Sequence, residues 1–327
     1  MTDRRLLLLA LGCALGGNPL PMQAQARIPR VGVLSFGARP KADPMHSFQQ
    51  GMRELGYVEG QNLILEERFA EGRPERLAAM AAELVRLKVD LIVAEGPGPL
   101  DAARKATRTI PIVAVSGSDP VREGWAQSLA HPGGNVTGLT VTYPELGPKR
   151  LEILKEAFPG HTRIAMLIAP GDLADATQGV VQEMQDGARR LGMQLQVFEV
   201  RSADDVDAAF RTARQARAQA LLVIATNVTF GHLARITELA VADRLPSISD
   251  FALVARSGLL MSYGADLEWL LRRSAVHADK ILKGARPGDL AIERPAKLQL
   301  VINLRTAKAL GVTIPQSMLV RADELIQ

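Results

Sequence analysis

The sequence VGVLSFG at residues 31–37 is a short apolar run that breaks at a glycine and leads into a helical pattern. A second run, IAMLIAPGD at residues 164–172, has the same form and breaks at Pro170 and Gly171. Continuous apolar runs followed by helices are typical of parallel strands that are covered on both faces. In such sheets, ligands sit beyond the carboxyl ends of the strands. Two such sheets facing each other across a hinge would form a cleft for a small molecule.

Strand and helix patterns alternate along both halves of the chain. In the first half we expect a helix over 74–89 and strands at 62–69, 90–94, 110–115 and 135–142. In the second half we expect helices over 146–158, 173–191, 204–216 and 229–244, and strands at 163–169, 194–200, 218–225 and 246–249. This alternation predicts an α/β protein with two Rossmann-like lobes, each a doubly wound parallel sheet.

The elements after residue 256 are too few for a third domain. They are a strand at 258–264, a helix over 266–283 and a strand at 298–303, followed by a short helix that stops at Gly311. Elements of this number usually complete sheets that have already begun, so we expect the chain to cross a multi-strand hinge. We therefore assign 27–142 plus about 258–297 to a first lobe, and 143–257 plus about 298–327 to a second.

Residues 1–26 have the form of a secretory signal peptide. Arg4 and Arg5 precede an apolar run at 6–15, and the sequence AQA ends at Ala26; the apolar run is too short to span a bilayer. We expect cleavage after Ala26 and a location in the periplasm. Two alternatives stay open, which are export by a twin-arginine signal and lipid attachment at Cys13.

Composition and motifs argue against several classes of function. Apolar residues make up 47% and charged residues 23% of the chain, and the net charge of +4 is spread along it, which does not favour nucleic acid binding. The five histidines lack a metal-binding spacing such as HExxH, and the sequence contains no GxSxG, P-loop or GxGxxG motif. We expect a binding protein without catalytic residues, metal or cofactor.

The predicted strand ends supply the candidate ligand-binding residues, which are small, polar or aromatic. In the first lobe they are Ser35, Phe36, Gly37, Glu95, Gly96, Ser116 and Asp119. In the second lobe and at the crossovers they are Tyr143, Asn227, Asp250 and Tyr263. Aromatic walls with a few convergent polar groups are what small-molecule clefts contain. Each of these residues also has an ordinary interpretation as part of a turn or of the core.

An amino-acid ligand would need a partner for both of its charges. Ser35, Ser116 or a helix start could donate to its carboxylate, and Asp119, Glu95 or Asp250 could pair with its ammonium group. Asp119 has a second interpretation, as the cap of a following helix. The same groups would suit other polar solutes, so the residues alone do not select the ligand.

The sequence FQQGMRELGYVEGQNL at 48–63 resembles the FxxGLxELGYxEGxN signature of a bacterial family of extracytoplasmic solute-binding proteins of ABC importers, including those of the tryptophan/tyrosine type. SDPV at 118–121, HPGGNVTG at 131–138 and NLRTAKALGVTIP at 303–315 also resemble this family. The resemblance spans the mature chain. It implies a type I periplasmic binding protein fold, with three crossovers between the lobes.

The resemblance also implies a function. It suggests a monomer that captures a small polar solute, such as an aromatic or branched amino acid, and delivers it to an ABC permease in the inner membrane. The chain departs from the family at 95–99, EGPGP, where a threonine with small residues is more usual. The ligand of a relative therefore does not transfer directly. The alternatives are an exported sensor that docks on a receptor and, less favoured, an enzyme that turns its solute over.

Overall fold

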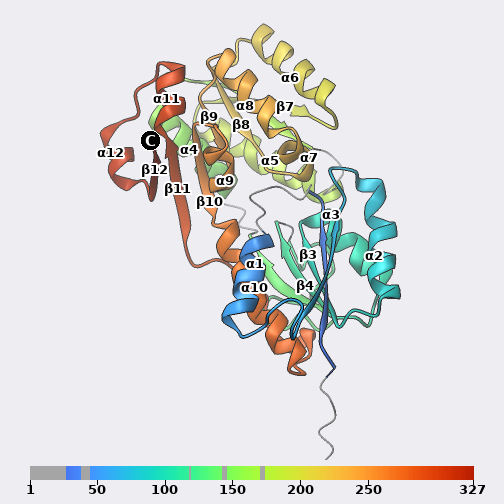
Figure 1. Cartoon of the computed structure of the whole chain (residues 1–327). Coiled ribbons are helices and arrows are strands. Elements are labelled where there is room, and N and C mark those ends of the chain that lie inside the picture. Colours follow the sequence, from blue (N-terminus) through green and yellow to red (C-terminus); the bar gives the residue numbers. More distant parts are fainter. Residues whose placement is uncertain (1–26, 38–44, 118, 142–145, 170–173) are drawn as a thin grey trace, which may run out of the picture.

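The structure is a computed structural model that describes residues 27–37, 45–117, 119–141, 146–169 and 174–327 (Figure 1). It contains two α/β lobes, each built around one mainly parallel sheet with helices on both faces. This arrangement confirms the fold class expected from the sequence. The signal-peptide interpretation of residues 1–26 falls outside the described residues.

The first sheet has five parallel strands in the order β2-β1-β3-β4-β5. The strands are β1 (Arg30–Ser35), β2 (Ile64–Phe69), β3 (Leu91–Glu95), β4 (Ile112–Ser116) and β5 (Val136–Thr140). Nearly every residue of β1, β3, β4 and β5 is buried, because helices cover both faces of the sheet. Only the edge strand β2 is half-exposed along its length.

Helices cover the first sheet in two layers (Figure 1). One layer contains α1 (Met45–Glu54) and α10 (Leu267–Leu282), which share an apolar cluster with the sheet. The other contains α2 (Leu77–Arg86), which follows the short turn η1 (Pro74–Arg76), and α3 (Pro97–Ala106). Gly51 lets α1 approach α10 closely, since a Cβ there would lie 2.5 Å from the carbonyl oxygen of Arg272.

The second sheet has seven strands in the order β12-β11-β10-β9-β8-β6-β7. The strands are β6 (Arg163–Ile168), β7 (Gln194–Glu199), β8 (Ala220–Val223), β9 (Ser247–Ser249), β10 (Met261–Ala265), β11 (Leu298–Asn303) and β12 (Glu324–Ile326). Only the β10–β11 pair is antiparallel among these strands. Strands β11 and β12 run parallel to each other and antiparallel to the other five, and they extend a sheet that is otherwise wound like the first.

Two apolar clusters flank the second sheet. One is formed with α4 (Leu146–Ala157), α5 (Ala174–Arg190), α11 (Leu304–Leu310) and α12 (Gln316–Arg321). The other is formed with α6 (Ala203–Gln215), α7 (Asn227–Gly231), α8 (Leu233–Ala242) and α9 (Ala252–Arg256). Each lobe therefore has a core on both faces of its sheet, which fixes the strand ends that carry the candidate site.

The chain crosses between the lobes three times. It passes from β5 to α4, from β10 to α10, and from the segment after η2 (Pro287–Asp289) to β11. Before the third crossing, Glu293 forms a parallel bridge with Leu139 in β5, and its carbonyl oxygen accepts a hydrogen bond from Thr140 N at 2.9 Å. The hinge is therefore made of three separate segments.

One boundary differs from the sequence-based expectation. The strand expected in the first lobe at 258–264 is β10, and it pairs with β9 and β11 in the second sheet. The helix that follows it, α10, does pack on the first sheet. The prediction placed strand and helix together because they are adjacent in sequence. The chain in fact changes lobes between them, at Asp266.

Candidate functional site

The two sheets share a winding order that defines where a ligand would bind. The order β7-β6-β8-β9-β10 repeats the order β2-β1-β3-β4-β5. In such sheets the chain reverses direction of winding between the first and third strand, which leaves a crevice beyond their carboxyl ends. The chain leaves both β5 and β10 at their carboxyl ends to enter the other lobe, so these edges face each other.

In the first lobe, a serine and a glutamate meet at this crevice. Ser35 ends β1 and Glu95 ends β3, and they are register partners across the strand pair. The Ser35 hydroxyl donates a hydrogen bond of 2.9 Å to Glu95 Oε2. Ser35 is buried and Glu95 is half-buried. The structure thus brings two predicted site residues together at the winding reversal.

The neighbouring first-lobe candidates have different surroundings. Gly96 has φ +93°, which turns the chain from β3 into α3. Ser116 ends β4 and is buried, with its side chain at the same sheet edge. Gly37 is exposed, and its carbonyl accepts from Glu71 N at 3.1 Å. Phe36 is only 4% exposed and packs in the core cluster that includes Leu34, so packing accounts for it.

Asp119 stabilises a turn. Its Oδ1 accepts from Val121 N at 3.0 Å and from Arg122 N at 3.2 Å, and the turn continues to Gly124 without becoming a helix. These contacts are those expected from the sequence for a capping aspartate, but the segment that follows Asp119 is a turn and not a helix. Asp119 also positions Arg122, whose guanidinium reaches the second lobe.

Arg122 makes a contact between the lobes away from the hinge. A Cβ built on Gly179 of α5 would lie 2.5 Å from Arg122 Nη2 and 2.7 Å from Nη1. The guanidinium therefore lies directly against the backbone of α5, at a position where the helix has no side chain. The contact joins the loop after β4 to the second lobe.

In the second lobe, Asp250 belongs to a buried charged cluster at the hinge. It follows β9, and its Oδ1 lies 3.4 Å from Arg150 Nη1 without hydrogen-bond geometry. Its Oδ2 accepts from Ala225 N at 3.2 Å. Burial raises the pKa of Asp250, while Arg150 and the Ala225 amide act in the opposite direction. The Asp250 side chain is 16% exposed and that of Arg150 is 9% exposed.

Tyr263 contributes its backbone to the same cluster. Its carbonyl oxygen accepts from Arg150 Nε at 2.8 Å, and its ring packs against the core between the second sheet and α4. The next residue, Gly264, has no room for a side chain, because a Cβ would lie 1.9 Å from the carbonyl oxygen of Asp250. Arg150 thus ties α4, the end of β9 and the β10 crossover together.

Two phenylalanines lie beside this cluster. The rings of Phe230 and Phe251 are stacked, with centroids 6.1 Å apart and planes 26° apart, and both side chains are half-buried. The turn that leads to Phe230 is fixed by a capping box, in which Thr226 and Thr229 exchange side-chain-to-backbone hydrogen bonds. Asn227 begins α7, but its side chain lies outside the described part, and so does all of Tyr143.

Sequence reasoning missed Arg150 and Arg122. Arg150 had a detectable signal, because it occupies the apolar stripe of α4 between Leu146 and Leu154 at four-residue spacing. A charged residue on a buried stripe requires a buried partner. Arg122 had no such signal, since its contact depends on how the two lobes approach each other.

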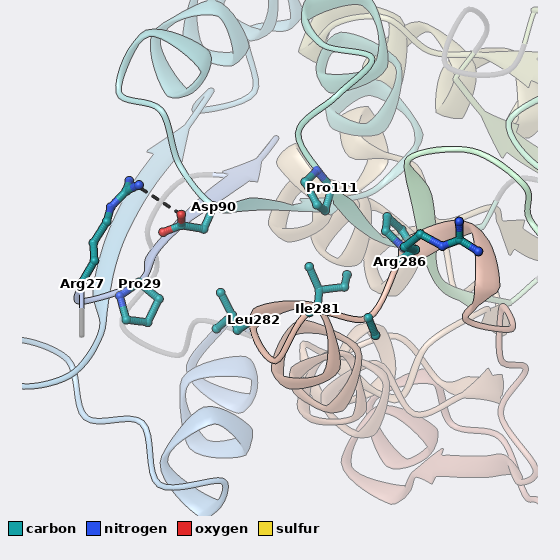
Figure 2. Close-up of a pocket in the computed structure, with 10 residues that line it drawn as sticks. Arg27, Pro29, Asp90, Pro111, Ile281, Leu282 and Arg286 are labelled. Carbon is teal, nitrogen blue, oxygen red and sulfur yellow. Dashed lines mark ion pairs between the residues drawn. The ribbon is translucent and has the colours of Figure 1, made fainter. Parts of the chain in front are cut away.

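A cavity lies at the opposite edge of the first lobe. It has a volume of about 470 Å³, and Figure 2 shows Ile281 and Leu282 of α10 facing Pro29, with Asp90 and Pro111 nearby. Pro29, Asp90 and Pro111 each precede a strand, so this cavity lies at the amino ends of β1, β3 and β4. Arg27 lies 3.6 Å from Asp90 across its rim. The cavity is therefore remote from the winding reversal.

The described residues contain no helix that is long and apolar enough to cross a membrane. They also contain no group of three or more histidine, cysteine, aspartate or glutamate side chains placed to hold a metal ion.

The fold and the facing strand ends agree with a comparison against known families. The model of the family described as ABC transporter substrate binding protein matches residues 30–326. The chain belongs to this family. Its members bind substrates for ABC transporters outside the cytoplasm, and the resemblance stated from the sequence motifs is confirmed.

Relatives of this substrate-binding protein include amino-acid binders. The tyrosine-binding protein of Clostridioides difficile (strain R20291) is 26% identical over 283 residues, which cover 86% of this chain and 81% of that one. The crystal structure of a Streptococcus pneumonia ABC domain in complex with L-Trp has a TM-score of 0.82 and 26% identity, covering 91% and 99% of the two chains. A conserved domain protein from Vibrio cholerae has a TM-score of 0.83 and 26% identity, covering 91% and 100%.

Proposed function

We propose that this substrate-binding protein captures an amino acid with an aromatic side chain between its lobes and delivers it to an ABC permease. The main support is the similarity, over nearly the whole chain, to an L-Trp complex and to a tyrosine-binding protein. Polar side chains at the strand ends of each lobe, such as Ser35 with Glu95 and Asp250, also support this proposal. We further propose that residues 1–26 direct export and that the mature protein acts in the periplasm.

The second lobe suits an aromatic ligand. The stacked, half-buried rings of Phe230 and Phe251 stand beside the carboxyl ends of β8 and β9. Aromatic rings prefer stacked or edge-to-face neighbours at centroid separations of about 4.5–7 Å, and such pairs add about 0.5–1.5 kcal/mol beyond area burial. A ligand ring that packs on this pair would extend the stack. An aliphatic ligand would lose that contribution.

The first test is thermal unfolding of the mature protein with a panel of solutes. The protein is unfolded, washed and refolded beforehand to remove any copurified ligand. A ligand at one hundred times its Kd adds about 2.7 kcal/mol to the free energy of unfolding, which raises Tm by several degrees in a chain of this size. We expect L-tryptophan or L-tyrosine to raise Tm and L-leucine, sugars and nucleosides to leave it unchanged.

Variants then locate the binding. Phe251→Leu keeps an apolar side chain but removes the ring, and we expect it to lower the affinity for aromatic ligands at least fivefold. Phe198→Leu is the control, because Phe198 packs in the same core but lies on β7, away from β8 and β9. A Tm increase with a different class of solute would overturn the aromatic assignment. Loss of uptake of labelled ligand by cells lacking this protein would test delivery to the permease.

A further inference from the structure

Arginines stand where the chain enters four neighbouring strands of the second sheet. Arg163 is the first residue of β6, and Arg190, at the end of α5, precedes β7. Arg217 lies between α6 and β8, and Arg244 lies between α8 and β9. These strands are adjacent in the order β7-β6-β8-β9. Their amino ends point away from the first lobe, because their carboxyl ends face it (Figure 1). We call these four residues the arginine rim.

Hydrogen bonds tie the turns of the arginine rim together. Arg163 Nε donates to the carbonyl oxygen of Arg217 at 2.7 Å. Arg214, in the last turn of α6, donates from Nη1 to Asp243 Oδ1 at 2.9 Å, which joins α6 to the residue before Arg244. Neighbouring strands lie about 4.8 Å apart, so the four strand starts extend over about 15 Å.

The arginine rim has an excess of positive charge. Arg190, Arg217 and Arg244 are exposed, and none of them forms an ion pair within the described part of the chain. Asp243, the acidic residue next to Arg244, has a side chain that is only 7% exposed and is already paired with an arginine of α6. Asp186 is likewise paired with the other arginine at the end of α5. The three exposed charges are therefore not balanced locally.

Local structure does not account for all of these side chains. Arg190 lies in the last turn of α5, where a positive charge complements the helix dipole. Arg217 and Arg244 follow the C-caps of α6 and α8, with φ of +53° and +50°. Glycine is the usual residue at such positions, because other side chains strain this backbone. Glycine would serve both turns better, which points to a role of the two arginines outside the fold.

The composition of the rim favours an anionic bilayer over other macromolecular partners. None of the exposed large apolar side chains of the described residues lies in the four turns. Protein interfaces bury an apolar core, and single-stranded nucleic acids stack on aromatic side chains. An anionic phospholipid surface needs neither, because it attracts basic side chains that remain in water. Arginine also suits phosphate, since its guanidinium donates two parallel hydrogen bonds to phosphate oxygens.

We propose that the arginine rim binds the phosphate groups of anionic phospholipids and so holds the protein at the membrane that contains its permease. The inference rests on the proposed export to the periplasm and not on the identity of the solute. Strand β6 is six residues long, which separates the rim from the crevice by about 20 Å. The protein can therefore bind the bilayer while its crevice stays open to a solute.

The test is cosedimentation of the mature protein with lipid vesicles. One set of vesicles contains phosphatidylcholine alone, and the other contains phosphatidylcholine and phosphatidylglycerol in equal amounts. In about 0.1 M NaCl we expect binding to the second set only. In about 1 M NaCl we expect release, because the Debye length falls from about 10 Å to about 3 Å. Inorganic phosphate should release no more protein than chloride does at the same ionic strength.

Variants assign the binding to the rim without straining its turns. Each basic side chain near an anionic surface changes the partition to vesicles roughly fivefold. We expect Arg190→Gln, Arg217→Gly and Arg244→Gly together to reduce the partition at least tenfold. Lys88→Gly is the matched control, because Lys88 has φ +52° at the turn into β3 in the first lobe, and it should leave the partition unchanged. Tm of each variant reports folding separately.

The outcomes separate this inference from the proposed function. Equal binding to both sets of vesicles, or binding to neither, would overturn it. An unchanged partition of the triple variant would also overturn it, because the bilayer contact would then lie elsewhere. Release by phosphate at constant ionic strength would replace the bilayer by a discrete phosphate site, and binding of a DNA oligonucleotide but not of vesicles would replace it by nucleic acid. Solute affinity in solution should be the same in the triple variant and the wild-type protein, so each proposal can fail without the other.

Discussion

At the scale of single residues, Arg150 is the side chain whose removal should lower the free energy of unfolding most. It pairs with buried Asp250 and donates to the carbonyl oxygen of Tyr263. Removing one partner of a buried ion pair typically costs about 3–5 kcal/mol, because the other charge stays buried. We expect Arg150→Met to lower the free energy of unfolding in urea by about 3 kcal/mol. The loss should grow as pH rises through the folded pKa of Asp250, which burial raises.

The neighbouring residue provides the control for this measurement. Lys149 pairs with Glu152 on the exposed side of α4, where both side chains are about half exposed. Exposed pairs of this kind contribute about 0.5 kcal/mol or less. Lys149→Met should therefore leave the urea midpoint nearly unchanged. Equal effects of the two substitutions would contradict the buried-pair account.

His277 should make stability sensitive to mild acid. Its side chain is 2% exposed, its Nε2 contacts the carbonyl oxygen of Ala291 at 3.1 Å, and Glu293 Oε1 lies 3.9 Å away. Burial lowers the pKa of His277, and Lys280 and Arg273 act in the same direction, while the Ala291 carbonyl and Glu293 oppose it. The neutral form is thus favoured in the folded state.

The sign of the pH effect follows from this lowered pKa. The unfolded chain takes up a proton near pH 6.5, whereas the folded His277 takes one up only at lower pH. The free energy of unfolding should fall as pH drops below about 6.5. We expect His277→Gln to flatten this dependence in urea titrations between pH 7 and pH 5, and His131→Gln, at an exposed position, to leave it unchanged. A residual slope is expected from His161, whose pKa is also lowered by burial.

At the scale of elements, the packing of α1 on α10 depends on a glycine. A Cβ at Gly51 would lie 2.5 Å from the carbonyl oxygen of Arg272 and 2.8 Å from Ala275 Cβ. Alanine favours a helix over glycine by about 1 kcal/mol, but overpacking costs about 1–3 kcal/mol. We expect Gly51→Ala to lower the free energy of unfolding. Gly231→Ala in α7, which has open space around it, should be neutral or stabilising.

Most elements could be predicted from sequence because the buried strands form clear apolar runs. The helix expected over 229–244 is divided in the structure into α7 and α8, which meet at His232. The short helix α7 begins earlier than expected, after the capping box at Thr226. The helix α3 was not predicted, since Gly96-Pro97-Gly98-Pro99 indicates a loop. Proline is tolerated in the first turn of a helix, where its missing N–H has no partner to lose.

The candidate site could be predicted only in part. The positions Ser35, Glu95 and Asp250 follow from strand ends, which the apolar runs locate within a residue or two. Their partners do not follow, because the Ser35–Glu95 hydrogen bond depends on strand register and the Asp250–Arg150 pair depends on the packing of α4. Phe36 shows the converse, because a strand-end aromatic side chain can equally turn into the core.

At the scale of the whole molecule, the contact between Arg122 and Gly179 should report on closure of the lobes. A larger side chain at Gly179 would occupy the place of the Arg122 guanidinium. Overpacking costs about 1–3 kcal/mol. If this cost falls only on the closed state, the Kd for the ligand becomes roughly 5- to 150-fold weaker. We expect Gly179→Leu to weaken ligand binding and to reduce the ligand-induced compaction seen by small-angle X-ray scattering.

Two variants test the source of this effect. Arg122→Ala in the Gly179→Leu background should restore much of the affinity, because it vacates the contested space. Gly187→Ala affects the same helix, but the added Cβ would contact Pro148 within the second lobe at 3.0 Å. It should change stability without changing compaction. Normal compaction of Gly179→Leu would show that the contact does not limit closure.

The three crossings also set the order in which the protein can fold during synthesis. The first sheet is complete in sequence at β5, but one of its faces is covered by α10, which is made more than a hundred residues later. A ribosome adding about 5–20 residues per second therefore leaves that apolar face open for several seconds. The second lobe likewise waits for β11 and α11. Neither lobe can therefore complete its apolar core before most of the chain has been synthesised.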